Sequence, residues 1–252
     1  MSLVTTTVYG RIHELRLARP PVNALNPELS NALAHAVHHA VAQGAGGIVL
    51  AGGPKVFSGG LDVPYLMSLG GDQDALLHAW TCFFSAARAL ASSPVPVVAA
   101  MAGHAPAGGC VLALCCDYRI MADGPFRIGL NETQVGLVAP EGIQYLLQRV
   151  VGVHRGERLL VAGAMPEAQE ALRLGLVDEL TDIDEVPVRA RVWLEELLRL
   201  PQMPMRETRA IARRDVVAAL EDERIDLPRF VGQWLHPDTQ DALRAMLARI
   251  GK

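Results

Sequence analysis

The stretch Gly103-His104-Ala105-Pro106-Ala107-Gly108-Gly109-Cys110 separates two apolar segments that favour different secondary structures. Residues 95–102 before it form a β-type run, and the glycine pair near its end opens an apolar helix. Residues 117–121 then return as a strand. A strand, a glycine-rich turn, a helix and another strand in this order predict an α/β fold for the centre of the chain.

A second glycine-rich loop, Phe57-Ser58-Gly59-Gly60-Leu61-Asp62, follows a short apolar strand predicted at residues 48–50. Glycines let a ligand come close to the backbone, and the start of a helix leaves N–H groups unpaired. Such donors can hold an anion or a developing oxyanion. Both loops can equally be ordinary turns between a strand and a helix, and their spacing does not separate these interpretations.

The N-terminal part of the chain also combines strands and helices. Residues 4–9 and 11–17 are rich in β-formers and are broken at Gly10, which predicts a hairpin. Asn26-Pro27-Glu28 predicts a helix start, with an asparagine cap, a proline at the first helical position and an acidic first turn. A further helix is predicted at about residues 76–90.

From about Pro140 the pattern is helical, with helices predicted at residues 161–174, 185–200, 206–220 and 238–250. Strands alternating with helices, followed by helices alone, predict an α/β core with a helical C-terminal region. We place the core in residues 1–195 and the C-terminal region in residues 196–252. We also expect Asp117 to pair with Arg119, and the arginine-rich stretch 206–214 to form a solvated or subunit-facing surface.

The composition of the 252 residues is that of a compact protein, with 50% hydrophobic and 20% charged residues. A net charge of −4 provides no excess of basic residues for binding DNA or RNA. The longest apolar runs, such as residues 95–102, are too short to span a bilayer, and residues 1–11 lack the pattern of a signal peptide. We therefore expect a cytoplasmic protein whose partners include neither nucleic acid nor a membrane.

Several other kinds of site are disfavoured. The glycines at 103 and 108 have the spacing of a phosphate loop, but Gly109-Cys110 occupies the places of lysine and serine or threonine. Ser58 lacks the G-x-S-x-G elbow of serine hydrolases. Four cysteines without C-x-x-C pairs predict reduced core residues: Cys82, Cys110, Cys115 and Cys116. Three histidines have helical spacing but no acidic or sulfur partner nearby, so we expect an exposed polar face and no metal there: His35, His38 and His39.

Taken together, these segments resemble the crotonase, or enoyl-CoA hydratase/isomerase, superfamily, and more closely its mitochondrial-type Δ3,Δ2-enoyl-CoA isomerases. The most specific strings are Gly129-Leu130-Asn131-Glu132-Thr133-Gln134 and Ala105-Pro106-Ala107-Gly108-Gly109-Cys110. The resemblance also includes residues 20–26, 57–62, 116–120, 152–155 and 168–178, so it covers most of the chain.

The resemblance implies a superhelix of ββα turns with a C-terminal helical region, assembled as a homotrimer or a dimer of trimers. It implies an acyl-CoA thioester substrate, with coenzyme A as part of that substrate and no separate cofactor. It places the catalytic carboxylate on Glu132 and the oxyanion hole on the backbone N–H groups of Leu61 and Gly108. Residues 19–26 match the segment that lies along coenzyme A. The other positions expected at the substrate are Gly59, Gly60, Asp62, Gly109, Asn131, Asn23 and Ala24.

Val111 is the most informative departure from the pattern. Hydratases of this superfamily place a second glutamate three residues after the oxyanion-hole glycine, where this chain has Val111. Hydration is usually shared between two carboxylates, whereas one base can move a proton from C2 to C4 of a 3-enoyl thioester. We therefore expect isomerisation of 3-enoyl-CoA to 2-trans-enoyl-CoA by Glu132. Hydration or another crotonase-type hydrolysis or cleavage, and a non-catalytic scaffold, remain alternatives. Glu141 is either a second carboxylate of the site or the acidic first turn of a helix.

Overall fold

The computed structural model describes residues 2–249, and six strands of this range form one sheet in the order β1-β2-β3-β4-β6-β8. β1 and β2 are antiparallel, and the other neighbours in the sheet are parallel. Two short strands, β5 and β7, pair separately. The strands are β1 (Val4–Tyr9), β2 (Ile12–Leu17), β3 (Gly47–Ala51), β4 (Val97–Met101), β5 (Ala105–Pro106), β6 (Tyr118–Ala122), β7 (Ile128–Gly129) and β8 (Glu179–Thr181).

The helices predicted in the N-terminal half are confirmed. This half contains α1 (Pro27–Ala42), α2 (Val63–Ser68), α3 (Gln73–Ala91) and α4 (Gly108–Leu114). The Asn26 side chain accepts a hydrogen bond from the Leu29 amide and caps α1 as the sequence predicts. Asp62 and Asp72 cap α2 and α3 in the same way. The sequence did not reveal α2, which is less than two turns long.

The C-terminal half is helical, but its boundaries differ from those predicted. The helix predicted at 161–174 is wrong, because Gly163 adopts a left-handed φ of +57° and ends one helix at Ala162. The stretch 206–220 is divided at Arg213, and the predicted end at Ile250 lies outside the described residues. The elements are η1 (Glu132–Val135), α5 (Glu141–Val151), α6 (Val153–Ala162), α7 (Ala168–Leu174), η2 (Ile183–Glu185), α8 (Val186–Leu198), α9 (Gln202–Ala212), α10 (Arg214–Ala218), α11 (Asp222–Ile225), α12 (Leu227–Trp234) and α13 (Pro237–Arg249).

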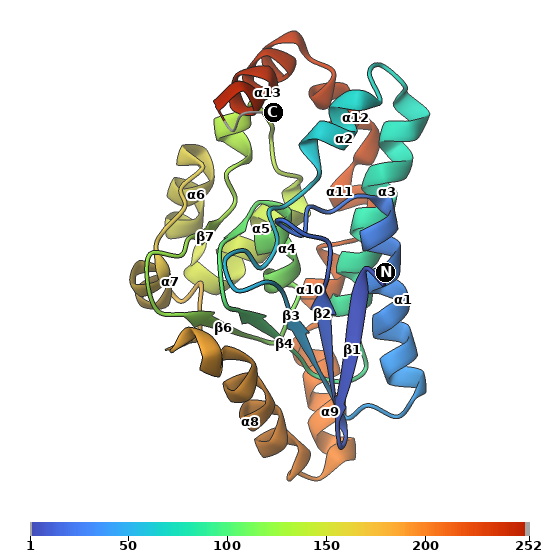
Figure 1. Cartoon of the computed structure of the whole chain (residues 1–252), viewed down its shortest axis with the longest axis vertical. Coiled ribbons are helices and arrows are strands. Elements are labelled where there is room, and N and C mark those ends of the chain that lie inside the picture. Colours follow the sequence, from blue (N-terminus) through green and yellow to red (C-terminus); the bar gives the residue numbers. More distant parts are fainter. Residues whose placement is uncertain (1, 250–252) are drawn as a thin grey trace.

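Both faces of the central strands β3 and β4 are buried. Alternate residues of β3 point to opposite faces, so Ile48 and Leu50 belong to a large core with α1 and α3, and Val49 and Ala51 belong to a smaller core with α8. Figure 1 shows α8 on one side of the sheet and α1 and α3 on the other. Strands buried on both faces read as continuous apolar runs, as residues 95–102 do.

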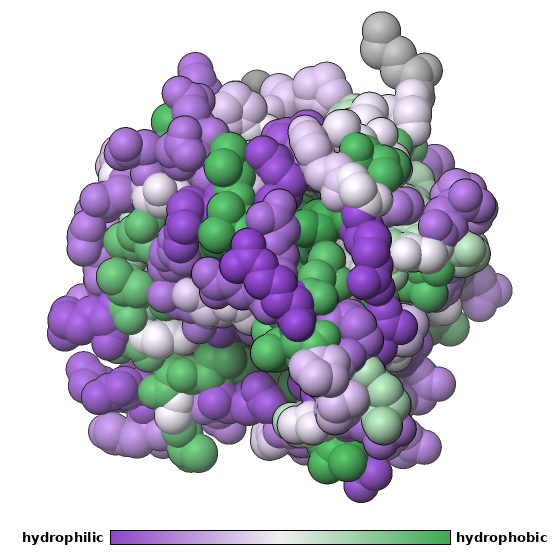
Figure 2. All heavy atoms as spheres, turned by 90° about the horizontal axis from the view of Figure 1, so that it is seen from below, coloured by the Kyte–Doolittle hydropathy of each residue, from purple (hydrophilic) through white to green (hydrophobic). Residues whose placement is uncertain are grey.

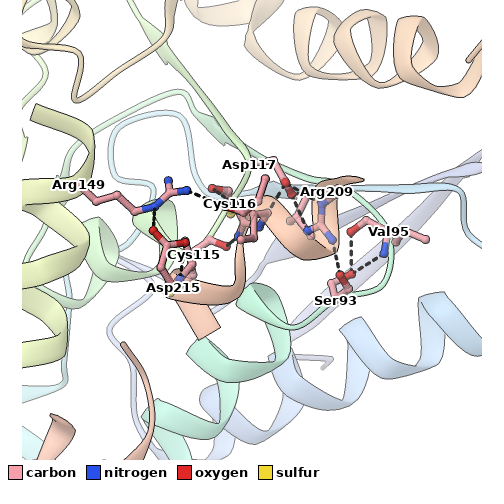
Figure 3. A network of polar contacts seen from close by, with 12 residues as sticks. Ser93, Val95, Cys115, Cys116, Asp117, Arg149, Arg209 and Asp215 are labelled. Atoms are coloured by element: carbon pink, nitrogen blue, oxygen red, sulfur yellow. Dashed lines mark hydrogen bonds and ion pairs between the residues drawn. The ribbon is translucent and has the colours of Figure 1, made fainter. Parts of the chain in front are cut away.

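The expected pairing of Asp117 with Arg119 is wrong. Asp117, at the start of β6, forms a two-point ion pair with Arg209 of α9, with N···O distances of 2.7 and 2.8 Å. Arg119 instead pairs with Asp178 at 2.8 Å. Figure 3 shows Arg209 turned toward Asp117, and Arg149 toward Asp215. Spacing along a strand cannot reveal these partners, which come from about 60 or more residues away along the chain.

The arginine-rich stretch 206–214 is likewise not a uniformly solvated surface. The side chains of Arg209 and Arg213 are only 12% and 11% exposed. Arg213 donates hydrogen bonds to the Cys115 and Cys116 carbonyls, just beyond the end of α4. These arginines therefore attach α9 and α10 to the segment that joins α4 to β6.

Apolar side chains are also exposed where α8 passes into α9. Leu200 and Met203 of this connection are 48% and 66% exposed. Figure 2, the view from below, shows hydrophobic side chains in small patches separated by hydrophilic ones. Scattered apolar residues are ordinary on protein surfaces, so these patches select no partner by themselves. Within residues 2–249, no helix has the length and apolar character needed to cross a membrane.

We predict that Asp117→Ala lowers the free energy of unfolding by about 3–5 kcal/mol, because it leaves the Arg209 guanidinium buried without its charge partner. Urea denaturation measures this change. The control is Asp241→Ala, which removes an exposed pair with Arg244 and should cost less than about 1 kcal/mol. Equal stabilities of the two variants would contradict the structural role of Asp117.

Candidate active site

A cavity of about 450 Å³ lies between the two glycine-rich loops and the C-terminal helices. Its walls are mainly apolar, with aromatic rings from α3 and α12: Trp80, Phe83, Phe84, Phe230 and Trp234. Leu61, Gly108 and Glu132, the three predicted catalytic positions, all line it. A mostly apolar cavity with a few polar groups is the usual form of a small-molecule site.

The N–H group of Leu61 points away from Leu25, the residue beside it. The Leu25 N–H donates to the Gly60 carbonyl at 2.7 Å, and the Asp62 N–H donates to the Leu25 carbonyl at 3.0 Å. In a trans peptide the N–H points opposite to the C=O, so the Leu61 N–H points away from Leu25. Among residues 2–249 it has no hydrogen-bond acceptor. This donor is therefore available to a ligand.

The Gly108 amide is turned outward by Ala107. Ala107 has φ +45° and ψ −117°, which is rare for a residue with a side chain. Its carbonyl accepts a hydrogen bond from the Val111 N–H at 3.0 Å and so points along α4. The Gly108 N–H consequently points out of the first turn, and it too lacks an acceptor in the described part of the chain.

The two loops are in direct backbone contact. A Cβ atom on Gly60 would lie 3.2 Å from the Gly108 nitrogen, and one on Gly109 would lie 2.5 Å from the Ser58 carbonyl oxygen. These positions accept no side chain without displacement of the backbone. The glycines thus bring the free N–H groups of Leu61 and Gly108 to one part of the cavity wall.

Glu132 begins the short helix η1, and its side chain reaches the same cavity. Its Oε2 atom is enclosed and has no hydrogen-bond partner among residues 2–249. Burial raises the pKa of this carboxyl to about 7, although a hydrogen bond with its own backbone N–H opposes the shift. A carboxyl with this pKa can both accept and return a proton near neutral pH.

Among residues 2–249, the lining around Glu132 holds no second free carboxylate. Val111 is buried in the cavity wall, at 3% exposure. Asp62 is the other acidic residue of the lining, and it is paired with Arg19 at 2.6 Å. Asn131 also lines the cavity, and its Oδ1 is enclosed without a partner in the described chain.

Glu141 lies outside the cavity. Its side chain is 75% exposed and pairs with Arg224 at 3.0 Å. It occupies the first turn of α5, as the alternative interpretation of the sequence had it. Glu141 is therefore not placed to act as a second carboxylate.

The expected substrate-binding residues divide into two groups. Gly59, Asp62, Asn131 and Ala24 line the cavity. Three others are not part of the lining and lie behind it: Asn23, Gly60 and Gly109. The buried Asn23 side chain accepts from the Arg19 N–H and donates to the Phe57 carbonyl, so it fastens the segment 19–26 to the first glycine-rich loop.

The sequence analysis did not find the contribution of the C-terminal helices. Phe230 and Trp234 of α12 and Leu243 of α13 complete the cavity wall within the same chain. Thr239 of α13 donates from Oγ1 to the Gly136 carbonyl at 2.6 Å, at the end of the turn that carries Glu132. The available signal was the four-residue spacing of Phe230 and Trp234, which places both rings on one helix face.

The histidines and cysteines noted in the sequence are not part of the cavity lining. The histidines of α1 lie on an exposed face, at positions 35, 38 and 39. The four cysteines are buried and free, as the sequence predicts. Burial raises the pKa of the Cys110, Cys115 and Cys116 thiols, so these side chains stay protonated.

The fold and the cavity have the parts that an enzyme needs for proton transfer next to a carbonyl group: two free amides, one carboxyl with a pKa of about 7 and apolar walls. The chain belongs to the enoyl-CoA hydratase/isomerase family, because the model of that family matches residues 7–231. The predicted family is therefore confirmed.

Named relatives include both isomerases and hydratases. Mitochondrial enoyl-CoA delta isomerase 1 of Mus musculus is 31% identical over 252 residues, covering 98% of this chain and 86% of the mouse protein. A probable enoyl-CoA hydratase of Mycobacterium avium is 34% identical over 197 residues, covering 78% of this chain and 76% of that protein. The crystal structure of human mitochondrial delta3-delta2-enoyl-CoA isomerase superposes with a TM-score of 0.92 at 30% identity, covering 99% of this chain and 98% of that one. This likeness confirms the predicted crotonase-type ββα core with C-terminal helices.

We predict that Glu132→Gln changes how stability depends on pH. Because folding raises the pKa of Glu132 from 4.5 to about 7, the folded state binds the proton more tightly, and the wild type loses stability as pH rises through that window. The glutamine variant lacks this loss. Urea unfolding at pH 5 and pH 8 should show the variant gaining stability relative to the wild type at the higher pH. A difference between the two proteins that is the same at both pH values would mean that Glu132 is not buried as a charge.

Proposed function

We propose that the protein is an enoyl-CoA isomerase that converts 3-enoyl-CoA into 2-trans-enoyl-CoA. The observation that carries the proposal is the combination of one unpaired carboxyl, Glu132, with two free backbone amides in one apolar cavity. The relatives named as enoyl-CoA delta isomerases support it, since they align over nearly the whole chain.

In the proposed reaction the ionised Glu132 removes a proton from C2 of the 3-enoyl thioester. Negative charge moves to the thioester oxygen, where the Leu61 and Gly108 N–H groups stabilise it by hydrogen bonds. The protonated Glu132 then returns the proton to C4, and the double bond moves from C3–C4 to C2–C3. A pKa of about 7 suits both steps, because the group must act first as a base and then as an acid.

The apolar walls suit the acyl chain and keep water from the intermediate. Aromatic rings of α3 and α12 surround the space beyond Glu132. Coenzyme A belongs to the substrate in this proposal, and the reaction needs no separate cofactor. Pro20 and Pro21, which also line the cavity, mark the proposed path of the coenzyme A portion.

Hydration of 2-enoyl-CoA is the second candidate, because relatives named as probable hydratases match the chain at similar identity. Val111 weighs against it. In the described chain the cavity offers no second free carboxylate that could activate a water while Glu132 handles the α-carbon.

Assembly and location stay predictions. We propose a homotrimer or a dimer of trimers, with residues 196–252 as a helical region that combines subunit contacts with the cavity wall. Light scattering after gel filtration measures the assembly. The cytoplasmic location is also a prediction, and the mouse and human relatives are named as mitochondrial proteins.

The deciding assay offers the pure enzyme 3-enoyl-CoA and, separately, 2-trans-enoyl-CoA in water. We expect rapid formation of 2-trans-enoyl-CoA from the first and little 3-hydroxyacyl-CoA from the second, because Val111 provides no second carboxylate. Chromatography against standards separates the two enoyl-CoA isomers, and mass spectrometry detects the water added in 3-hydroxyacyl-CoA. Vigorous hydration by the wild type would overturn the isomerase proposal while leaving the family intact.

We predict that Glu132→Gln removes most turnover of 3-enoyl-CoA, by about 10²–10⁴-fold in kcat, because a well-placed proton-transfer group contributes that much. Glu141→Gln is the matched control, since its exposed carboxylate should leave kcat nearly unchanged. Circular dichroism checks that both variants fold. Retention of more than about a tenth of wild-type kcat in Glu132→Gln would exclude it as the base.

We predict that Gly108→Val is far more damaging than Leu61→Ala. A Cβ on Gly108 would crowd Leu25 Cδ1 at 3.2 Å, Phe83 Cε2 at 3.3 Å and Gly60 Cα at 3.4 Å, so a branched side chain would move the amide. Loss of one such donor costs about 10²–10³-fold in kcat. Leu61→Ala keeps its N–H and changes only packing. Similar kcat values in two folded variants would mean that the thioester oxygen does not bind between these amides.

A further inference from the structure

We propose that the Arg19–Asp62 ion pair is a positioning brace that fixes the direction of the Leu61 N–H. The inference rests on the proposed function, in which this N–H binds the thioester oxygen. It assigns to Arg19 and Asp62 a role in the rate of the chemical step, separate from contact with the substrate.

The brace joins the segment 19–25 to the first glycine-rich loop. The Arg19 guanidinium donates to the Asp62 carboxylate at 2.6 Å and to the Ala24 carbonyl at 2.9 Å. Between these contacts lie the two backbone hydrogen bonds of Leu25, to the Gly60 carbonyl and from the Asp62 N–H. Arg19 therefore closes a ring of contacts that runs through Ala24, Leu25 and Asp62, next to the peptide that carries the Leu61 N–H.

The ring acts on the orientation of the Gly60–Leu61 peptide together with two flanking hydrogen bonds, from the Gly60 N–H to Ser58 Oγ at 3.2 Å and from the Val63 N–H to the Leu61 carbonyl at 2.9 Å. The Gly60 φ of +81° lies in a region that favours glycine, and a glycine restrains the rotation of the peptide less than a residue with a side chain does. The Leu25 N–H restrains this rotation through its hydrogen bond to the Gly60 carbonyl, on the N-terminal side of Leu61. Asp62, held by Arg19 and Leu25, restrains the chain on the C-terminal side. A misplacement of about 1 Å at a reacting centre can cost roughly 100-fold in rate.

The two oxygens of Asp62 have separate tasks. Oδ1 accepts from the Tyr65 N–H and caps α2, whereas Oδ2 accepts from Arg19. Asparagine is as good a helix cap as aspartate, so Asp62→Asn can keep the cap while removing the charge from the brace. The side chains of Arg19 and Asp62 are 29% and 11% exposed, so solvent screens the pair only in part.

The experiment compares Asp62→Asn, Arg19→Met and the double variant by kcat and KM with 3-enoyl-CoA, and by the Raman C=O stretch of bound trans-cinnamoyl-CoA. Hydrogen bonds from an oxyanion hole lower that frequency, so it reports on the Leu61 and Gly108 N–H groups together, and a variant that misplaces either donor shifts it. We expect each single variant to lower kcat about 10–100-fold with KM within about twofold of wild type, and to recover part of the free-ligand frequency. The double variant should be no worse than the single ones, because both remove the same brace.

The control is Arg189→Met, which breaks a comparable pair with Glu179 at 2.6 Å on α8, away from the cavity, and should change neither readout. A raised KM with an unchanged C=O frequency in Arg19→Met would overturn the proposal, because it would make Arg19 a substrate contact. Unchanged kcat and frequency in Asp62→Asn would overturn it as well. A wild-type enzyme that leaves the C=O frequency at its free value would instead refute the oxyanion hole of the proposed function.

Discussion

The contact between Gly60 and Gly108 is the constraint on which the site depends. Backbone meets backbone there, with only 3.2 Å between the Gly108 nitrogen and the position of a Cβ on Gly60. Two loops from distant parts of the chain can come this close only without side chains, and their free amides then belong to the same wall. The buried sheet supplies the rigidity, because β4 leads directly into the second loop and its residues are covered on both faces.

Hydrogen bonds and ion pairs also fix the C-terminal end of α4. Arg213 binds the Cys115 and Cys116 carbonyls beyond the helix, and Asp117 is bound both to Arg209 and to the Val97 N–H of β4. The charges that the sequence shows as an arginine-rich surface thus hold the short helix that presents Gly108. The same hydrogen bonds and ion pairs therefore contribute to the stability of the fold and to the orientation of the Gly108 N–H.

Much of the fold could be predicted from local patterns, since capping, turn glycines and apolar runs act within a few residues. The Asn26 cap and the hairpin at Gly10 are examples. The prediction failed where the decisive partner is remote or the signal is ambiguous: Gly163 ends a helix whose amphipathic spacing continues beyond it, and Asp117 pairs across 92 residues. In the site, the resemblance placed Glu132, but its enclosure and raised pKa depend on neighbours that only the folded chain brings together. The same holds for Asn23, which fastens the segment 19–26 to the first glycine-rich loop and does not line the cavity.

The hydrogen bond from Thr239 of α13 to the Gly136 carbonyl links this C-terminal helix to the turn that carries Glu132, the proposed base. The same helix and its neighbour α12 close the apolar wall. A change in the C-terminal segment therefore alters the space for the acyl chain and the environment of the carboxyl together. We expect exchange of this segment between relatives to change the shape of the cavity and the surroundings of Glu132 as one unit, while the two glycine-rich loops stay the same.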